Sequence, residues 1–162
     1  MKTIYLAGGC FWGLQKYLDQ FDGVWETEVG YANGPEWKPT YEQVCKDSGH
    51  AETVRVVYDE QKITLEKLLD LFFQVIDPTS VNRQGHDEGI QYRTGIFYTE
   101  REQIPAIREV YDKIEKKAGR KLTVLVEQIT TFYPAEEYHQ KYLDKNPDGY
   151  CHIPQRYLHI EQ

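Results

Sequence analysis

Cys10 has the clearest chemical setting in this sequence, inside the hexapeptide GGCFWG at residues 8–13. Residues 3–7 have the composition of a short strand, and residues 11–21 carry apolar side chains at helical spacing, so the thiol falls at a strand-to-helix turn. A thiol at a helix N-terminus faces unpaired N–H groups and the positive end of the helix dipole, which lower its pKa. We therefore expect Cys10 to be an accessible thiolate nucleophile, exposed by a tight glycine turn.

Phe11 and Trp12 place two large aromatic side chains directly after this cysteine. Aromatic rings beside a reactive sulfur can form an apolar pocket for a small alkyl group such as a methyl. The alternative is that Cys10 is a small buried hydrophobe and that both rings belong to the core, which holds for most cysteines. The glycines around the thiol favour the reactive interpretation.

The hexapeptide resembles the peptide methionine sulfoxide reductase A family, whose catalytic cysteine lies in GCFWG. Further blocks resemble the same family, in its order, over most of the chain. They are TYEQVC at residues 40–45, GHAE at 49–52, NRQG at 82–85, Asp87 with QYR at 91–93, ExxHQxYL at 136–143 and NPxGYC at 146–151. The resemblance implies one catalytic domain over residues 1–162, with a resolving cysteine in its tail at 149–162.

The activity that this resemblance implies is reduction of methionine sulfoxide, of the S epimer at sulfur, either free or in proteins. Cys10 would attack the sulfoxide sulfur and become a sulfenic acid. Glu52 matches the family's acid, and a carboxyl near aromatic rings can have its pKa raised enough to stay protonated. Tyr41 and Tyr92 match the tyrosines that hold the sulfoxide oxygen. Asp87 matches the remaining polar residue of the pocket, where it would fix a water or a neighbouring donor.

Cys151 matches the family's resolving cysteine, which implies a Cys10–Cys151 disulfide reduced by a thioredoxin-like partner, with no cofactor. Residues 152–162 carry no further cysteine, so we expect one resolving step. Cys45 matches a position that the chemistry does not require. Two departures from the family pattern are a loop at 46–48 that is shorter by one residue, and His86 where asparagine is expected; we expect His86 to be exposed.

Composition narrows the class of protein and of partner. The chain has 162 residues, 28% charged and 40% hydrophobic, with a net charge of −7. It has no basic cluster for a phosphate backbone, so nucleic acid is not an expected partner. It has neither the apolar segment of a signal peptide near its start nor about 18 apolar residues in a row. We expect a soluble, cytoplasmic monomer with no membrane attachment.

The pattern of elements predicts an α+β fold, an α/β two-layer sandwich with a mixed sheet flanked by helices, long loops and an irregular C-terminal tail. The expected strands are 3–7, 24–31, 53–58, 94–98 and 122–129. The expected helices are 11–21, 64–76, 99–117 and 134–143. Two long loops, 32–51 and 79–93, separate them, and their length favours a functional role.

Two other functions remain open. A metal-binding module could use Cys45, His50, His86, His139 and Cys151, although none of these forms a CxxC or HxxxH pair. A thiol peroxidase would use the same sulfenic acid chemistry on a peroxide. The aromatic pair after Cys10 argues against the peroxidase, because a peroxide needs no pocket for a methyl group.

Overall fold

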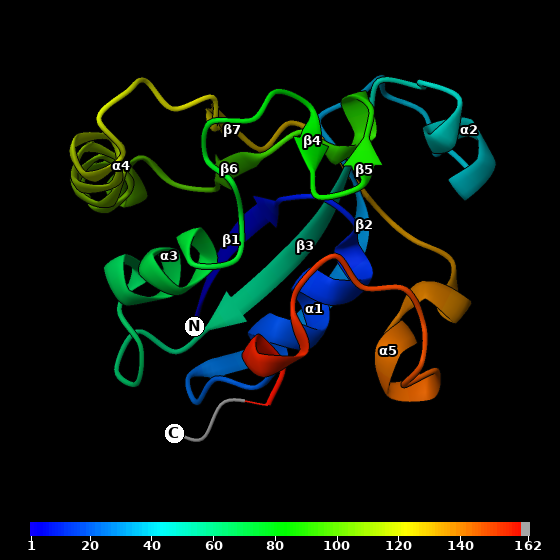
Figure 1. The fold of residues 1–162 in the computed structure, drawn as a ribbon, viewed down its shortest axis with the longest axis horizontal. Helices are drawn as coiled ribbons and strands as arrows, with labels where there is room; N and C mark the ends of the chain where they lie inside the picture. Colours follow the sequence, from blue (N-terminus) through cyan, green and yellow to red (C-terminus); the bar gives the residue numbers. More distant parts are fainter. Residues whose placement is uncertain (160–162) are drawn as a thin grey trace.

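The computed structural model describes residues 1–159, and its central element is a mixed six-stranded sheet of order β7-β6-β1-β3-β2-β8 (Figure 1). Only β6 and β7 are parallel; the other neighbours are antiparallel. The strands are β1 (Lys2–Ala7), β2 (Val24–Ala32), β3 (Ala51–Tyr58), β6 (Gly95–Tyr98), β7 (Leu125–Gln128) and β8 (Phe132–Pro134). The predicted mixed sheet flanked by helices is confirmed.

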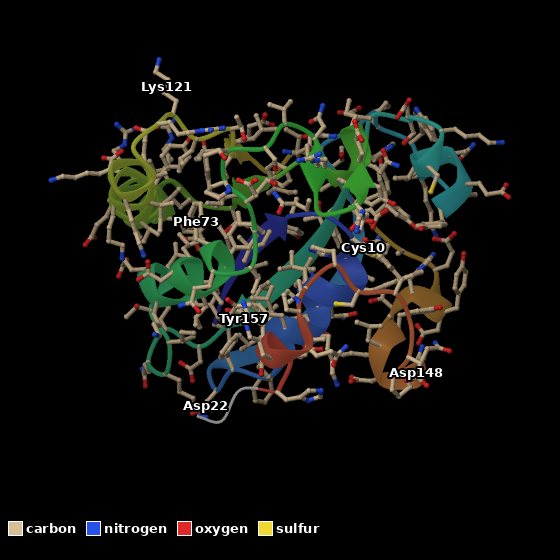
Figure 2. All side chains as sticks on the ribbon, in the orientation of Figure 1. Cys10, Asp22, Phe73, Lys121, Asp148 and Tyr157 are labelled. Atoms are coloured by element: carbon tan, nitrogen blue, oxygen red, sulfur yellow. The ribbon has the colours of Figure 1, made fainter. Side chains whose placement is uncertain are left out.

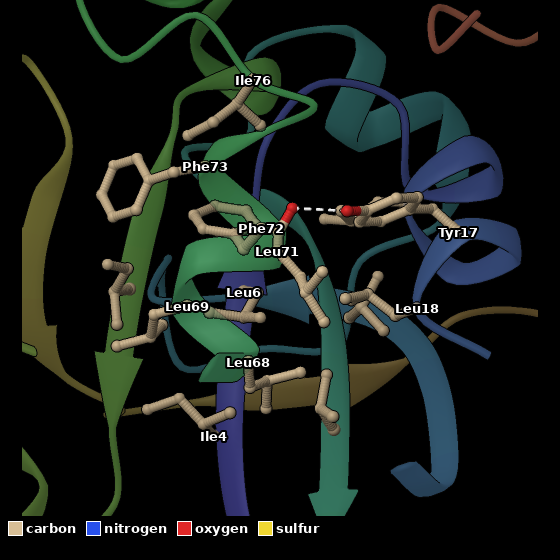
Figure 3. Close-up of a cluster of buried hydrophobic side chains, with 14 of the residues drawn as sticks. Ile4, Leu6, Tyr17, Leu18, Leu68, Leu69, Leu71, Phe72, Phe73 and Ile76 are labelled. Carbon is tan, nitrogen blue, oxygen red and sulfur yellow. Dashed lines mark hydrogen bonds between the residues drawn. The ribbon is translucent and has the colours of Figure 1, made fainter. Parts of the chain in front are cut away.

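The main core lies between this sheet and three helices, α1 (Phe11–Asp19), α3 (Leu65–Phe73) and α4 (Ile104–Ala118). Side chains alternate along β1, so that Ile4 and Leu6 face the helices (Figure 3). Tyr5, between them, packs against a smaller cluster. Tyr17 of α1 donates its hydroxyl to the Leu71 carbonyl of α3 at 2.6 Å, which joins the two helices inside the core. Burial of this apolar face fixes α1, and with it the turn that precedes α1.

The two long segments expected as loops contain short elements. The first holds α2 (Tyr41–Cys45), which Thr40 opens with a complete capping box to Gln43. The second holds a hairpin of β4 (Arg83–Gln84) and β5 (Asp87–Glu88), followed by a 3-10 turn, Ile90–Tyr92. The Thr-x-x-Gln signal was visible in the sequence, whereas a two-residue hairpin has no periodicity that a pattern could reveal.

The predicted helix at 134–143 is wrong. The structure has β8, a 3-10 turn at Glu137–His139 and a single helical turn, α5 (Tyr142–Lys145). Gln140 explains the break, because its side-chain amide bonds the N–H and the carbonyl of Val29 in β2 and so holds the chain against the sheet edge. The predicted strand at 122–129 is shorter, since β7 begins at Leu125. Between α5 and residue 159 the tail is irregular except for a 3-10 turn at Gln155–Tyr157, as expected; residues 160–162 lie outside the described part.

None of the helices in residues 1–159 is both long enough and apolar enough to span a membrane.

Candidate active site

Cys10 is the N-cap residue of α1, directly after β1, and Glu52 lies in the neighbouring strand β3. The antiparallel register pairs Leu6 with Val54, so the continuation of β1 runs beside Glu52. The Cys10 N–H donates to Asp87 Oδ2 at 3.3 Å, and the Phe11 N–H donates to Glu52 Oε1 at 3.2 Å. Two carboxyl groups from β3 and β5 therefore accept hydrogen bonds from N–H groups that a helix N-terminus leaves unpaired, and they fix the turn that holds the sulfur. Figure 2 labels Cys10 at the start of α1.

Glu52 is a buried carboxyl, with 1% of the residue exposed. Burial raises its pKa to about 8, against the opposing effect of the Phe11 N–H bond. At neutral pH the carboxyl is thus mostly protonated. Its second oxygen, Oε2, is buried without a hydrogen-bond partner. A protonated carboxyl with an unpartnered oxygen can donate its proton to a substrate atom that binds beside the thiol.

Cys10 itself differs from the sequence expectation, because it is only 4% exposed and its pKa is raised well above the ordinary value. Burial is the largest cause and the negative charge of Glu52 is the next. The backbone N–H of Trp12 donates a hydrogen bond to the sulfur and lowers the pKa, but this effect is smaller than the effect of burial. The expected accessible, low-pKa thiolate is therefore wrong for this state. The helix N-terminus has the predicted effect, but desolvation outweighs it.

The two aromatic residues after Cys10 have different surroundings. Phe11 is fully buried in the core, whereas Trp12 is half-buried and stacks on Tyr142 with ring centroids 3.8 Å apart. The Trp12 indole N–H donates to His139 Nδ1 at 2.9 Å. The Tyr41 ring contacts the same histidine, with centroids 4.4 Å apart. His139 thus joins the aromatic wall of the site, a function that sequence reasoning missed.

His139 accepts through Nδ1, so its neutral form carries the proton on Nε2. Burial lowers the pKa of this imidazole, which favours that neutral form. His139 and Tyr142 both belong to the ExxHQxYL block. Their spacing of three residues indicates that the two side chains lie on the same side of the chain, but it does not indicate that both contact Trp12.

Tyr41, the first residue of α2, and Tyr92, in the 3-10 turn after β5, come from the two long connecting segments. Both phenols are half-buried. Burial raises both pKa values, and the charges of Glu52 and Cys10 raise them further, so both hydroxyls stay protonated at neutral pH. The Tyr41 N–H donates to Glu136 Oε2 at 3.0 Å, which fixes the start of α2.

Cys151 is half-buried in the tail, against the first turn of α1. A Cβ at Gly13 would lie 2.7 Å from Cys151 Sγ, so only glycine leaves room for the sulfur there. All three cysteines are free thiols. Cys45 is exposed and contacts the Tyr41 hydroxyl, and His86 is exposed in the β4–β5 turn, as expected.

The residues considered for a metal site are not gathered. His50 contacts Ser48 and the Pro35 carbonyl, and His139 contacts Trp12. Within residues 1–159, no group of three or more His, Cys, Asp or Glu side chains has an arrangement that could hold a metal ion.

Comparison with known proteins identifies the family. A family model described as peptide methionine sulfoxide reductase matches residues 2–161. The chain belongs to this family. The peptide methionine sulfoxide reductase MsrA of Lachnoclostridium phytofermentans is 56% identical over 155 residues, covering 95% of this chain and 93% of that one.

Two solved structures are similar to this member of the peptide methionine sulfoxide reductase family. Mxr1 from Saccharomyces cerevisiae in its reduced form has a TM-score of 0.89 and 42% identity, covering 93% of this chain and 88% of that one. Mxr1 in complex with Trx2 has a TM-score of 0.62 and 29% identity, covering 87% and 84%. The resemblance stated from the sequence blocks is confirmed.

Proposed function

We infer that the chain is a peptide methionine sulfoxide reductase, which reduces methionine sulfoxide to methionine with Cys10 as its nucleophile. Family membership gives the reaction class. The observation that carries the assignment of residues is Glu52, whose pKa of about 8 leaves it protonated beside Cys10 with a free buried oxygen. A sulfoxide is reduced only if its oxygen accepts a proton, and Glu52 is placed to give one.

In the reducing step the Cys10 thiolate attacks the electrophilic sulfur while Glu52 protonates the sulfoxide oxygen. Two electrons pass from the Cys10 sulfur to the methionine sulfur, the S–O bond of the sulfoxide breaks, and Cys10 ends as a sulfenic acid. In net terms one thiol and one sulfoxide give one sulfenic acid and one thioether. Tyr41 and Tyr92 hold the oxygen through hydroxyls that stay protonated, and Asp87 holds the Cys10 N–H.

Ionisation of Cys10 is tied to Glu52. The negative charge of Glu52 is the second cause of the raised pKa of Cys10, so a protonated Glu52 favours the thiolate. The proton on Glu52 therefore has two effects: it favours ionisation of Cys10, and it is the proton that the sulfoxide oxygen receives. The hydrogen bond from the backbone N–H of Trp12 to the sulfur stabilises the thiolate further, as does the positive end of the α1 dipole.

Trp12 forms the apolar side of the pocket for the methyl group of the substrate. Its indole is fixed by the stack on Tyr142 and by the bond to His139, so the methyl side is rigid. The oxygen side is formed by Glu52, Tyr41 and Tyr92. A methyl wall and an oxygen wall at fixed positions discriminate the two sulfoxide epimers, and we assign the S epimer, in free or protein-bound methionine sulfoxide, from the family.

Cys151 resolves the sulfenic acid. Its sulfur attacks the Cys10 sulfur, the S–O bond breaks, and the hydroxide leaves and takes a proton to become water, so a disulfide forms. A thioredoxin-like dithiol then reduces the disulfide, and no prosthetic group takes part. Two observations support this route, the position of Cys151 against Gly13 and the solved complex of Mxr1 with Trx2. The free thiols fit a reducing compartment such as the cytoplasm.

The test is a single turnover of the reduced protein with a racemic methyl sulfoxide, followed by mass spectrometry of product and enzyme. We expect loss of the S epimer alone, about one thioether per enzyme, and a peptide cross-link between Cys10 and Cys151. Hydrogen peroxide is the matched alternative substrate. Faster turnover on peroxide than on the sulfoxide would assign the site to a thiol peroxidase instead.

A further inference from the structure

Both sequence neighbours of Cys151 contact one carboxyl group. The Tyr150 hydroxyl bonds Asp87, and His152 Nδ1 lies 3.6 Å from Asp87 Oδ2. The same Oδ2 accepts the Cys10 N–H at 3.3 Å. A single side chain therefore links the backbone of the nucleophile to the residues before and after the resolving thiol.

His152 is unusual among the buried polar residues. Its side chain is 3% exposed, and neither ring nitrogen has a partner in hydrogen-bond geometry. The ring lies over the backbone of Gly9, where a Cβ would come within 2.9 Å of Nε2. Burial lowers the pKa of this imidazole more than the nearby Asp87 and the Gly8 carbonyl raise it, so the neutral form with one N–H is favoured. The Gly8 carbonyl and the Asp87 carboxyl, 3.6 Å away, are both close to the ring, yet neither is in hydrogen-bond geometry, so a small shift of the ring can complete a hydrogen bond to Asp87.

The Cys151 sulfur must move toward the Cys10 sulfur for the disulfide to form, since both are free thiols here. In this reduced state Cys151 Sγ packs against Gly13, and its sulfur exchanges hydrogen bonds with the N–H and carbonyl of Ile153 at 3.4 Å. A disulfide requires the two sulfurs to come within about 2.05 Å of each other. Asp87 stays in place during this movement, because it belongs to the β4–β5 hairpin and holds the Cys10 N–H.

We propose that His152, together with Tyr150, is a positioning residue for the resolving step: as the tail advances, its imidazole closes onto Asp87 and aligns Cys151 with the Cys10 sulfenic acid. This inference rests on the proposed function. The chemistry is the attack described above, with the Cys151 sulfur forming the S–S bond and hydroxide leaving Cys10 as water. His152 touches neither sulfur in that step and acts through Asp87. It therefore affects the second half of the cycle and not the first.

The experiment follows both halves in the same samples. Reduced protein is mixed with one equivalent of a methyl sulfoxide and quenched at timed intervals with a sulfenic acid trap and a thiol-alkylating reagent. Mass spectrometry then counts thioether product, trapped Cys10 sulfenic acid and Cys10–Cys151 disulfide. For His152→Ala we expect thioether formation at the wild-type rate and a sulfenic acid lifetime that is longer by roughly tenfold or more.

Companion variants separate positioning from packing. His152→Leu fills the space over Gly9 without a polar atom and should show the same delay as His152→Ala. His152→Gln keeps an N–H donor and should recover most of the wild-type rate of disulfide formation. Tyr150→Phe removes only the hydroxyl and should give a smaller delay. Gln155→Ala, an exposed residue of the same tail, is the matched control and should change neither step.

Disulfide formation at the wild-type rate in both His152→Ala and His152→Leu would overturn the proposal. So would an equal slowing of thioether formation and disulfide formation, since that would place His152 in the reducing step or in general stability. The proposed function fails separately, because then the wild-type protein itself would give no thioether.

Discussion

The two thiols of the proposed cycle lie in parts of the molecule that differ in regular structure. Cys10 follows β1 and its acid Glu52 lies in β3, the central pair of strands, under a core formed with α1 and α3. Cys151 lies in a tail whose only regular element, up to residue 159, is a 3-10 turn at Gln155–Tyr157. The reducing step needs a fixed arrangement of donor and nucleophile, whereas the resolving step needs a thiol that travels. The reducing step therefore uses residues on the central strands, and the resolving step uses a residue in the irregular tail.

The largest effect is expected from removing Cys10, the thiol that both steps share. We expect Cys10→Ser to abolish thioether formation, because a serine hydroxyl at this position is not ionised and cannot accept the oxygen as a sulfenic acid. Product measured by mass spectrometry after a single turnover checks this. Appreciable turnover by a correctly folded Cys10→Ser protein would remove Cys10 from its function.

Cys151→Ser separates the two regions. We expect about one thioether per enzyme in a single turnover, at the wild-type rate, and then no cycling with thioredoxin as reductant. Cys45→Ser is the comparison variant, since Cys45 is the exposed thiol beside the Tyr41 hydroxyl. If Cys151→Ser cycles as fast as wild type and Cys45→Ser does not, the resolving thiol is Cys45.

Glu52→Gln tests the rigid half alone. Glutamine keeps an acceptor for the Phe11 N–H but has no acidic proton, so we expect the reducing step to slow by about 10²–10⁴ with little change in substrate binding. The pH profile sharpens the test. The reducing step needs a protonated Glu52 and an ionised Cys10, and the pKa of Cys10 is raised well above its ordinary value while that of Glu52 is about 8. The reactive pair thus holds one proton, so the wild-type rate should rise as the pH approaches about 8 and fall only at more alkaline pH, where both groups have lost their protons. A Glu52→Gln protein that still shows this alkaline fall, or that is impaired only in binding, would contradict the assignment of Glu52 as acid.

The contrast between the two regions also separates what the sequence could reveal from what it could not. The strand, the glycine turn and α1 are local, and their residue pattern predicts where Cys10 lies. The pKa of Cys10 could not be predicted, because it depends on burial and on Glu52, 42 positions away along the chain. The contact of His152 with Asp87 joins segments of which neither has a periodic pattern, so only the folded chain reveals it.

Gly13→Ala tests how the tail is seated. A Cβ there would lie 2.7 Å from Cys151 Sγ, so the thiol must shift away from α1. Alanine is also a better helix former than glycine, so α1 and the reducing step should persist. We expect disulfide formation to slow several-fold while thioether formation is retained. The same timed quench measures both rates. An unchanged rate of disulfide formation would show that the resolving step does not depend on the contact of Cys151 with Gly13.

Trp12→Phe should have the smallest effect, because it keeps an aromatic ring on the methyl side of the pocket. It removes the indole N–H that His139 Nδ1 accepts, and His139 would then have no partner at either ring nitrogen. Leaving a buried polar atom without its partner costs about 1–3 kcal/mol, so the free energy of unfolding should fall by an amount in that range. Steady-state kinetics should show a several-fold higher KM with kcat nearly unchanged, since the freed ring no longer holds one position. Trp25→Phe, at a residue that is 71% exposed, is the control and should change neither quantity. Equal effects from the two substitutions would mean that the bond to His139 does not position the pocket, and the rigidity assigned to this region would then rest on the backbone of α1 alone.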